Sequence, residues 1–397
     1  MTTRTNSPTR LPAPAGGGAT AGMRRPRPRL RILVYALAEI DVPGGPAVHT
    51  LNLLEGFREI GCDARLVCPR PRARPAEPLP AECRFVPFFG FGPVRLLAFA
   101  GLSFLRLAGQ ALTWAPHAIH ARYDENAALP ALAALLTRTP LVIDLNGPIP
   151  RRTAWSRLPF RIARGLIANS EELRRRTCAE FAVPAERSRV VSMHVDTERF
   201  RPLSRERCRA ELGLEAGVPI IGYIGTFQPA HDLDVMLDGF DELVRTGFDA
   251  RLLLVGGGNE EARCRARAAS LSAADRIRFT GWVPHERVPL YVNSFDVGLA
   301  LLKPEKAFAT EAFLKIKEYL ACGVPVVAND CDAALFEEYP AGAVRRPGGS
   351  GAAALAAAIR ASLREPAPSE AARAFIEQRF NLAAAARRTE DFIRSIV

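Results

Sequence analysis

The sequence predicts an α/β protein made of two doubly wound parallel sheets in tandem. The first observation is length, because 397 residues, of which 48% are hydrophobic, exceed what one average core accommodates. The second is a repeated alternation of short apolar runs with longer amphipathic stretches, which is typical of parallel strands joined by helices. The third is a break in this alternation at 196–219, which holds a short helix but no strand candidate. Two such sheets facing each other leave a central cleft.

The first series of elements precedes this break. Its strands are expected at 31–38, 64–68, 84–88, 118–122, 141–145, 165–169 and 189–195. Its helices are expected at 46–60, 94–113 and 170–181. Ser170, followed by Glu171 and Glu172, suits the start of the last helix, because a serine oxygen caps backbone amides and acids are favoured in the first turn.

The second series follows the break. Its strands are expected at 219–225, 251–255, 276–280, 296–301 and 324–328. Its helices are expected near 232–246, 259–271, 285–293, 312–321 and 351–364, with a helix-rich end at 369–397. We therefore expect an N-terminal domain at 29–200, a C-terminal domain at 201–380, and a C-terminal helix at 381–397 that can return to the N-terminal domain.

Much of the net charge of +11 lies near the N-terminus. Residues 1–31 contain seven arginines and no acid, so the rest of the chain carries a net charge of only +4. Thr, Pro, Ala and Gly dominate the first part of this segment, a composition that cannot bury enough apolar surface to offset the entropy of ordering. We expect residues 1–28 to be a disordered basic tail, and we predict no nucleic-acid partner.

Membrane contact is an open question for the apolar stretch 85–114. Arg95 and Arg106 interrupt it, and no window of about 18 apolar residues lacks a charge, so we do not expect a membrane-spanning helix. The stretch either packs on the first sheet or forms an interfacial helix on anionic lipid. The eight cysteines form no C-x-x-C pair, which favours reduced thiols and a cytoplasmic location, with the inner membrane face as the peripheral alternative.

Two D-x-D patterns, at 232–234 and 330–332, raise the question of a metal. We expect no bound metal, because Asp232 is placed to cap a helix and no cluster of His, Cys and carboxylates has ligand spacing.

Glycines follow several of the expected strands, where they allow close approach of backbone to a ligand or a simple tight turn. The first is Val42-Pro43-Gly44-Gly45-Pro46, which is not the G-x-G-x-x-G fingerprint of dinucleotide binding. No acid ends the second strand, so a nicotinamide enzyme is disfavoured. The others lie in the second half, in Ile221-Gly222-Tyr223-Ile224-Gly225-Thr226-Phe227, Val255-Gly256-Gly257-Gly258 and Phe279-Thr280-Gly281-Trp282-Val283-Pro284.

These segments and the run Glu311–Val327, in their order along the chain, resemble glycosyltransferase family 4, retaining enzymes with the GT-B fold of two Rossmann-like domains. The resemblance extends from Ile32 to about Asp332, and its most specific part is E-Y-L-A-C-G-V-P-V-V, which begins at Glu318. The N-terminal half matches at the glycine loop and in four further segments, which are Ile119-His120-Ala121-Arg122-Tyr123, Leu145-Asn146-Gly147, Ile167-Ala168-Asn169-Ser170 and Val195-Asp196-Thr197-Glu198-Arg199-Phe200.

The resemblance implies roles for individual residues. Glu318 would bind the ribose hydroxyls of a nucleotide-sugar donor, and Lys315, on the same helix face, would neutralise the departing phosphate. The remaining donor-binding candidates are Phe313, Leu314, Gly225, Thr226, Gly256, Gly257 and Val283. The acceptor-binding candidates are Gly44, Gly45, Tyr123 and Asn146.

The sequence also departs from the family pattern. The first glutamate of the family's usual pair is displaced by one residue to Glu311, and Thr226 and His231 replace the usual phosphate-clamping arginine and lysine. Arg122 stands near the position of an acceptor-side histidine. Glu311, His231 and Arg122 therefore join Lys315 as catalytic candidates.

The resemblance implies a retaining, metal-independent hexosyltransferase that uses a nucleoside-diphosphate sugar and no other cofactor. The acceptor hydroxyl would belong to a saccharide, a lipid-linked molecule or a small molecule. Two alternatives are a non-catalytic sugar-nucleotide-binding protein and a sugar-nucleotide epimerase of the same fold.

Overall fold

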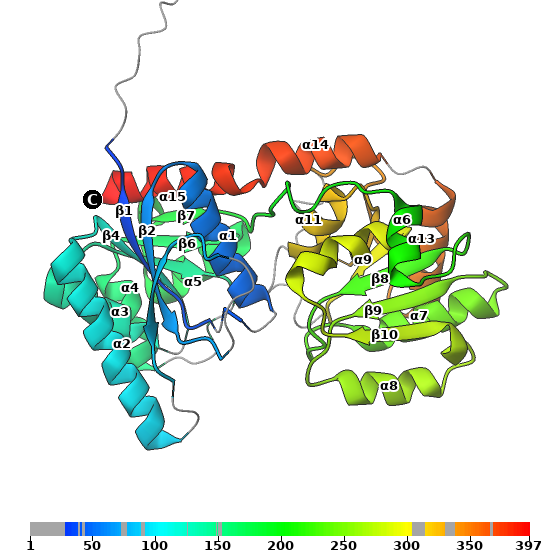
Figure 1. Ribbon diagram of the computed structural model, residues 1–397, viewed down its shortest axis with the longest axis horizontal. Helices are drawn as coiled ribbons and strands as arrows, with labels where there is room; N and C mark the ends of the chain where they lie inside the picture. Colours follow the sequence, from blue (N-terminus) through cyan, green and yellow to red (C-terminus); the bar gives the residue numbers. More distant parts are fainter. Residues whose placement is uncertain are drawn as a thin grey trace, which may run out of the picture.

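The computed structural model describes residues 28–38, 40–41, 44–72, 78–88, 92–124, 126–147, 149, 153–303, 314–329, 338–365 and 368–397. The tail predicted at 1–28 lies outside these residues, apart from Pro28. The described chain forms two α/β halves, each built on its own parallel sheet, which confirms the predicted fold class (Figure 1).

The N-terminal sheet has seven strands in the order β3-β2-β1-β4-β5-β6-β7. They are β1 (Arg31–Tyr35), β2 (Asp63–Pro69), β3 (Glu82–Val86), β4 (Ala118–Arg122), β5 (Leu141–Leu145), β6 (Gly165–Ala168) and β7 (Ser188–Val190). The order changes direction between β1 and β4. The loops at the carboxyl ends of these two strands diverge there, which favours ligand binding at that edge.

Helices cover both faces of this sheet. They are α1 (Gly45–Glu59), α2 (Pro93–Trp114), α3 (Ala128–Thr137), α4 (Ala154–Ile162) and α5 (Glu171–Phe181). Alternate residues of β1 point to opposite cores, since Ile32 and Val34 pack in the core that includes α1, whereas Leu33 and Tyr35 pack in the core that includes α2, α3 and α4. The predicted cap of α5 is confirmed, because the Ser170 hydroxyl accepts a hydrogen bond from the Leu173 amide at 3.1 Å.

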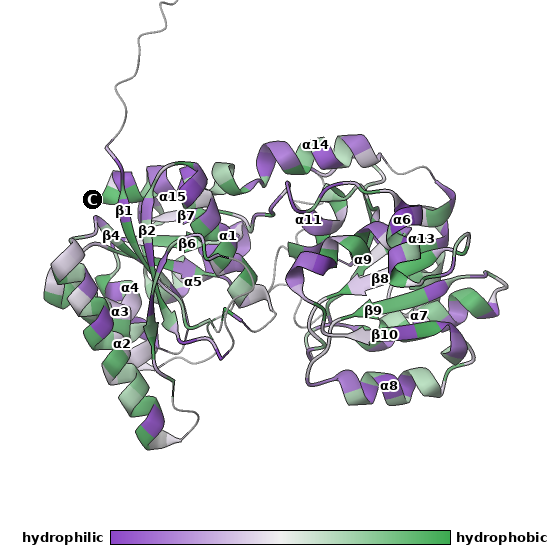
Figure 2. Ribbon diagram, in the orientation of Figure 1, coloured by the Kyte–Doolittle hydropathy of each residue, from purple (hydrophilic) through white to green (hydrophobic). Residues whose placement is uncertain are grey.

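The C-terminal sheet has six strands in the order β10-β9-β8-β11-β12-β13. They are β8 (Ile220–Ile224), β9 (Arg251–Val255), β10 (Ile277–Gly281), β11 (Val297–Ala300), β12 (Val326–Ala328) and β13 (Val344–Arg345). Its helices are α6 (Arg205–Leu212), α7 (Leu233–Arg245), α8 (Glu261–Ala269), α9 (Val288–Ser294), α11 (Leu314–Ala321) and α13 (Ala352–Arg364). The inner strands β9, β11 and β12 are apolar and almost wholly buried, whereas the outer face of α8 is polar (Figure 2), as expected for a sheet enclosed by helices.

The C-terminal helices α14 (Ser369–Arg379) and α15 (Leu382–Ile396) run from the second half to the first (Figure 1). The chains of α1 and α15 approach so closely that a Cβ atom on Gly56 would lie 2.6 Å from the carbonyl oxygen of Leu382. At the crossing, the Val195 amide donates to the Phe380 carbonyl at 2.9 Å. The last helix therefore belongs to the core of the N-terminal half.

The expectation of no membrane-spanning helix stays a prediction. Residues Val94–Trp114 of α2 are long and apolar enough to cross a membrane by length and composition alone, despite their two arginines. The helix nevertheless packs on the sheet, because Phe99 and Leu107 are buried in the N-terminal core.

Candidate functional site

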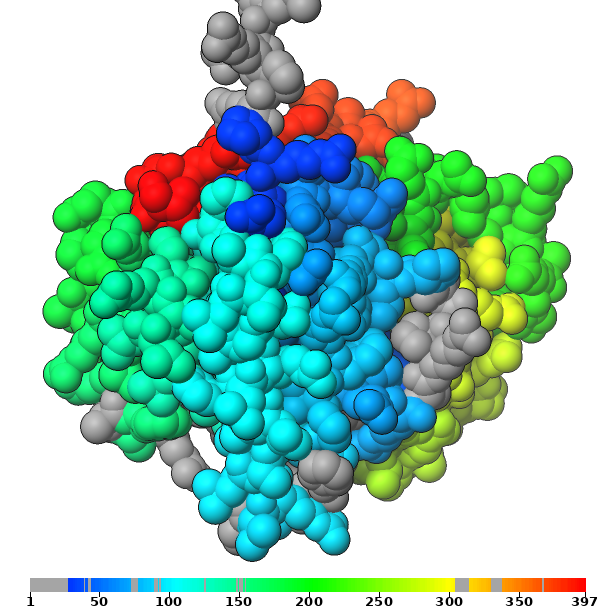
Figure 3. Space-filling model, turned by 60° about the vertical axis from the view of Figure 1, so that its left-hand side comes forward, coloured from blue at the N-terminus to red at the C-terminus, as the bar shows by residue number. Residues whose placement is uncertain are grey.

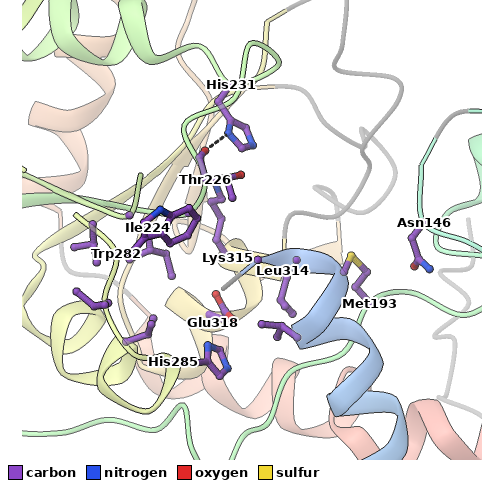
Figure 4. Close-up of a pocket in the computed structure, with 18 of the residues that line it drawn as sticks. Asn146, Met193, Ile224, Thr226, His231, Trp282, His285, Leu314, Lys315 and Glu318 are labelled. Atoms are coloured by element: carbon purple, nitrogen blue, oxygen red, sulfur yellow. Dashed lines mark hydrogen bonds between the residues drawn. The ribbon is translucent and has the colours of Figure 1, made fainter. Parts of the chain in front are cut away.

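A cavity of about 290 Å³ lies between the two halves and is lined from both (Figure 4). The N-terminal half contributes Gly44, Gly45, Val48, Asn146, Asn169 and Met193. The C-terminal half contributes Ile224, Gly225, Thr226, His231, Val255, Gly256, Trp282, Val283, His285, Val288, Leu314, Lys315 and Glu318. The carboxyl ends of β1, β5, β8 and β9 thus converge on one space, as parallel sheets that face each other require.

Two glycines allow β8 and β9 to end side by side. Gly225 has φ 136° and Gly256 has φ 126°, values that side-chain-bearing residues rarely adopt. A Cβ atom on Gly256 would lie 2.0 Å from the Gly225 carbonyl oxygen, and one on Gly225 would lie 3.0 Å from Lys315 Nζ. Glycine at both positions therefore opens the space that the lysine enters.

Lys315 and Glu318 point into the cavity from consecutive turns of α11 (Figure 4). Both are buried, with exposures of 8% and 6%. Burial raises the pKa of Glu318 to about 7, against the opposing effect of the Lys315 charge. Lys315 Nζ lies 4.1 Å from the centroid of the Tyr223 ring. The neighbouring Tyr319 fixes the helix, because its hydroxyl accepts a hydrogen bond from the Ile224 amide at 2.8 Å.

His231 lies at the other end of this part of the cavity. Its Nδ1 is 2.7 Å from the Thr226 carbonyl oxygen, which can only accept, so Nδ1 carries the proton. Burial and the charge of Lys315 lower the pKa of His231 to about 3, so the imidazole is neutral. The Tyr223 hydroxyl also donates to the Thr226 carbonyl, at 2.9 Å, and so holds the loop from Gly225 to His231.

The loop that follows β10 forms another wall. Trp282, which is 47% exposed, and Val283 stand at the cavity beside His285. A Cβ atom on Gly257 would lie 3.0 Å from Trp282 Nε1, so Gly257, although it does not line the cavity, permits the approach of the indole.

The N-terminal wall includes the start of a helix. Gly44 and Gly45 stand where the first backbone amides of α1 open toward the cavity, an arrangement that favours anions or hydroxyl oxygens. Met193, which lines the same cavity, is held from the opposite half, because Lys317 of α11 donates to its carbonyl oxygen at 2.6 Å. Both halves therefore contribute to the position of this wall.

Several predicted site residues stand away from the cavity. Arg122, the last residue of β4, does not line the cavity. Burial lowers the pKa of its guanidinium group. The ring of Tyr123 stacks on Phe160 at 5.2 Å, and its hydroxyl donates to the Ser156 carbonyl at 3.2 Å. The roles proposed for Arg122 and Tyr123 stay predictions.

Other predictions fall on parts that the structure does not describe. Glu311 and Phe313 lie outside the described residues, as do Asp330 and Asp332. Within the described residues, no group of three or more His, Cys, Asp or Glu side chains is arranged to hold a metal.

A buried polar cluster behind the N-terminal wall was missed by sequence reasoning. His49 Nε2 on α1 lies 3.0 Å from Asp144 Oδ2 on β5, and His120 Nε2 lies 3.9 Å from the same oxygen. Burial would raise the pKa of Asp144, but the hydrogen bond from His49 and the nearby histidines hold it well below its usual range. Burial and the charge of His49 lower the pKa of His194 to about 3. An acid inside the apolar strand 141–145 was the signal that could have found it.

Two family models match the chain, one for each half. The model described as Glycosyltransferase Family 4 matches residues 43–199, and the model described as Glycosyl transferases group 1 matches residues 218–365. Together they span most of the two domains.

Proteins with similar sequences are also glycosyltransferases. A D-inositol 3-phosphate glycosyltransferase of Nocardia farcinica is 32% identical over 172 residues, which cover 42% of this chain and 37% of that protein. A 2-deoxystreptamine glucosyltransferase of Streptomyces kanamyceticus is 30% identical over 182 residues, which cover 45% of this chain and 46% of that protein. A GDP-mannose-dependent alpha-(1-6)-phosphatidylinositol monomannoside mannosyltransferase of Mycolicibacterium smegmatis is 30% identical over 213 residues, which cover 47% of this chain and 56% of that protein. The chain thus spans roughly half the length of the relatives it matches.

Solved structures reproduce the fold across both halves. Sucrose-phosphate synthase from Thermosynechococcus elongatus superposes with a TM-score of 0.75 at 18% identity, covering 92% of this chain and 99% of that one. HepE of Anabaena in complex with UDP-glucose superposes with a TM-score of 0.73 at 19% identity, covering 92% of this chain and 100% of that one. Since a family 4 model matches the first domain, a glycosyltransferase group 1 model matches the second, and GT-B neighbours superpose over nearly the whole molecule, the chain belongs to glycosyltransferase family 4 and has the GT-B fold.

Proposed function

We propose that this chain is a retaining glycosyltransferase that transfers a sugar from a nucleoside-diphosphate sugar to an acceptor hydroxyl. The observation that carries the proposal is the buried pair Glu318 and Lys315, set one turn apart on α11 in the cavity between the domains. A carboxylate and an ammonium group at this separation suit the two ends of a nucleoside diphosphate, the ribose and the phosphates. This donor class is supported by HepE, whose structure was solved in complex with UDP-glucose, and by the mycolicibacterial relative, which is GDP-mannose-dependent.

At the ribose end, Glu318 accepts hydrogen bonds from two hydroxyls. The pKa of about 7 means that the carboxyl group is partly protonated at neutral pH. Hydrogen bonds to the charged form favour it, so donor binding lowers this pKa and releases a proton. Glu311 is proposed to reach the donor sugar, and Trp282 and Val283 to flank the base.

At the phosphate end, Lys315 stabilises the charge that develops on the departing diphosphate. His231 is neutral at physiological pH, and its second ring nitrogen can be protonated when an anion binds beside it. These two side chains, together with the loop amides at Gly225 and Thr226 and those at the start of α11, supply the stabilisation that a divalent metal would otherwise give. The proposed reaction is therefore metal-independent.

Retention of configuration is the outcome that this lining favours. Among the described lining residues, Glu318 is the one carboxylate, and its proposed role is at the ribose. A donor phosphate oxygen would then receive the proton of the acceptor hydroxyl, on the same face of the sugar that the leaving group occupies. Gly44, Gly45 and Asn146 would hold the acceptor on the opposite wall.

The test begins with ligand binding. Melting temperature is measured with UDP and with GDP, since a diphosphate at about 100 times its Kd stabilises the native state by about 2.7 kcal/mol. Hydrolysis of the matching donor, without acceptor, is then followed. Slow release of nucleoside diphosphate supports the transferase. Binding without any release supports a non-catalytic protein, conversion of the sugar while still attached to the nucleotide supports an epimerase, and absence of binding to both diphosphates contradicts the proposal.

A further inference from the structure

The outer surface of the helical layer α2, α3 and α4 concentrates exposed apolar side chains. We call it the α2 face. Of the twelve large hydrophobic residues that are exposed among the described residues, nine lie on these three helices. They are Val94, Leu96, Leu97, Leu102, Leu105, Leu112, Leu135, Leu136 and Trp155. Because scattered single exposures are ordinary in proteins, it is this concentration that requires an explanation.

Helix α2, coloured cyan, lies at the front of the view in Figure 3, and apolar residues occur along its whole length (Figure 2). Val94, Leu97, Leu105 and Leu112 are 79%, 73%, 65% and 66% exposed. Their spacing of three, eight and seven residues places them on one side of a helix. The α2 face therefore includes an apolar stripe that no described part of the chain covers.

The charge of the α2 face is of one sign. The described residues 92–123, 126–143 and 153–170 contain no aspartate and no glutamate. The exposed arginines on the three helices and just after α3 are Arg95, Arg106, Arg138, Arg157 and Arg161. Several arginines elsewhere on the surface pair with acids, as Arg174 does with Glu171 and Arg267 with Asp238. Leucines flanked by uncompensated arginines complement a surface that is both apolar and anionic.

Helix α2 is attached to its domain along its other side. Phe99, Ser103, Leu107 and Ala111, each four residues after the last, are buried. At the end of the helix, Arg65 of β2 lies 4.4 Å from the centroid of the Trp114 ring. Leaving the domain to span a bilayer would expose this buried stripe and the sheet beneath it, so the helix is suited to lying in the plane of a membrane surface.

A hollow of about 360 Å³ opens on the α2 face between the end of β3 and α2. Its lining includes Leu102, Leu105 and Arg106. An apolar wall beside a guanidinium group matches a lipid phosphate next to its acyl chains. This combination favours a lipid over a nucleic acid, because acyl chains can contact the exposed leucines and a nucleic-acid backbone cannot.

We propose that the α2 face docks on an anionic phospholipid bilayer, with α2 in the interfacial plane. The proposal goes beyond sugar transfer and does not depend on it, because docking needs neither donor nor acceptor. Helix α2 begins seven residues after the carboxyl end of β3, at the sheet edge that also carries Gly44 and Asn146. Docking would thus bring the membrane to the acceptor side of the cleft.

The experiment is co-sedimentation of the full chain with vesicles of phosphatidylcholine alone and of an equal mixture with phosphatidylglycerol. The wild type is expected to bind the mixed vesicles, to bind the neutral ones at least about tenfold more weakly, and to dissociate as salt screens the charges. Bound protein is expected to be released by alkaline carbonate. Equal binding to both vesicles, no binding to either, or resistance to carbonate would overturn the proposal.

Paired variants separate the apolar and charged contributions. Leu97→Glu with Leu105→Glu, and Arg95→Glu with Arg106→Glu, are each expected to weaken binding to the mixed vesicles by about tenfold or more. Arg207→Glu with Arg278→Glu makes the same charge change at exposed sites of the other domain and is expected to bind like the wild type. Thermal melting confirms folding of each variant. Binding lost equally in the control pair, or a wild-type dimer that the leucine variants dissociate, would assign the α2 face to another role.

Discussion

Glu318 is held in an environment that a carboxyl group does not favour by itself. It is buried in an apolar helix context, and its nearest described cation, Lys315, offsets only part of the cost of burial. A buried carboxyl group with a raised pKa is typical of ligand-binding sites. Two ribose hydroxyls of a bound donor would supply the hydrogen bonds that water supplies to this group in the unfolded chain.

Replacement of Glu318 by glutamine should separate binding from folding. Glu318→Gln keeps the shape and loses the charge-assisted hydrogen bonds, so kcat/KM is expected to fall by about 10- to 100-fold, with a higher donor KM. Initial rates at varied donor concentration give both parameters. Glu370→Gln, at an exposed position of α14, is the matched control. Unchanged kinetics in Glu318→Gln would remove this residue from the donor site.

The same carboxyl group should make the stability of the protein, measured without donor, depend on pH. Its pKa is about 7 in the folded protein, against 4.5 for an ordinary glutamate, so the folded protein binds more protons between these values than the unfolded chain does. Its contribution to stability is therefore full below pH 4.5 and is lost as the pH rises through 7, by at most about 3 kcal/mol.

The buried histidines oppose this trend. His231 and His194 have pKa values lowered to about 3, so their contributions are present above 6.5 and are lost as the pH falls. The measurement is consequently a difference: urea unfolding of the wild type minus Glu318→Gln from pH 4.5 to 7.5. A difference that does not change with pH would show that Glu318 is not buried in its neutral form.

At the scale of elements, the ends of β8 and β9 depend on glycine. Gly256→Ala would place a Cβ atom against the Gly225 carbonyl at a left-handed φ, and we expect a loss of about 2–4 kcal/mol in the free energy of unfolding. Gly217→Ala is the control, since Gly217 also has positive φ but has nothing within 4 Å of the added carbon, so only about 1 kcal/mol is expected. Chemical denaturation measures both. Equal losses would show that backbone strain, and not the close approach, is responsible.

Helices and strands whose apolar residues recur with a clear period could be predicted from the sequence, and those without such a period could not. The strand expected at 251–255 coincides with β9, and the helix expected at 94–113 is α2 within a residue at each end. Helix α3 was not predicted, because its sequence ALPALAALLT has almost no polar face. Helix α4 was not predicted either, because it contains Pro159, and it begins on the capping box of Thr153.

The residues of the candidate site also fall into a group that could be predicted and a group that could not. The residues that line the C-terminal wall follow one another in recognisable local segments, so they could be placed from the order of those segments. The contact of His49 with Asp144, and that of Met193 with Lys317, join residues that are 95 and 124 positions apart. Only tertiary packing brings such pairs together, and no local period signals it.

At the scale of the whole molecule, Lys317 joins three parts of the chain. From α11 its ammonium group donates to the Met193 carbonyl, and it lies 4.3 Å from the centroid of the Phe380 ring. It is fully buried. Lys317→Met keeps the length and removes the charge, leaving a buried carbonyl without this donor, so we expect a loss of about 2–4 kcal/mol in stability.

The same variant should also affect the donor. Since Lys317 positions Met193 on the cavity wall, the donor KM of this variant is expected to rise. Urea unfolding and donor kinetics are measured together. A variant with wild-type stability and wild-type KM would show that the relative position of the two domains does not depend on this hydrogen bond.

The two crossings of the chain between the halves, near Val195 and near Phe380, are hydrogen-bonded to each other and lie along one side of the molecule (Figure 1). Two connections on the same side constrain how the halves can move relative to each other. We expect a rotation about the line through these two crossings to be easier than a translation of one half along the other. Such a rotation would change the width of the cavity on the side away from the crossings while it disturbs the crossings themselves little, and that side is where we expect a donor nucleotide to enter and leave.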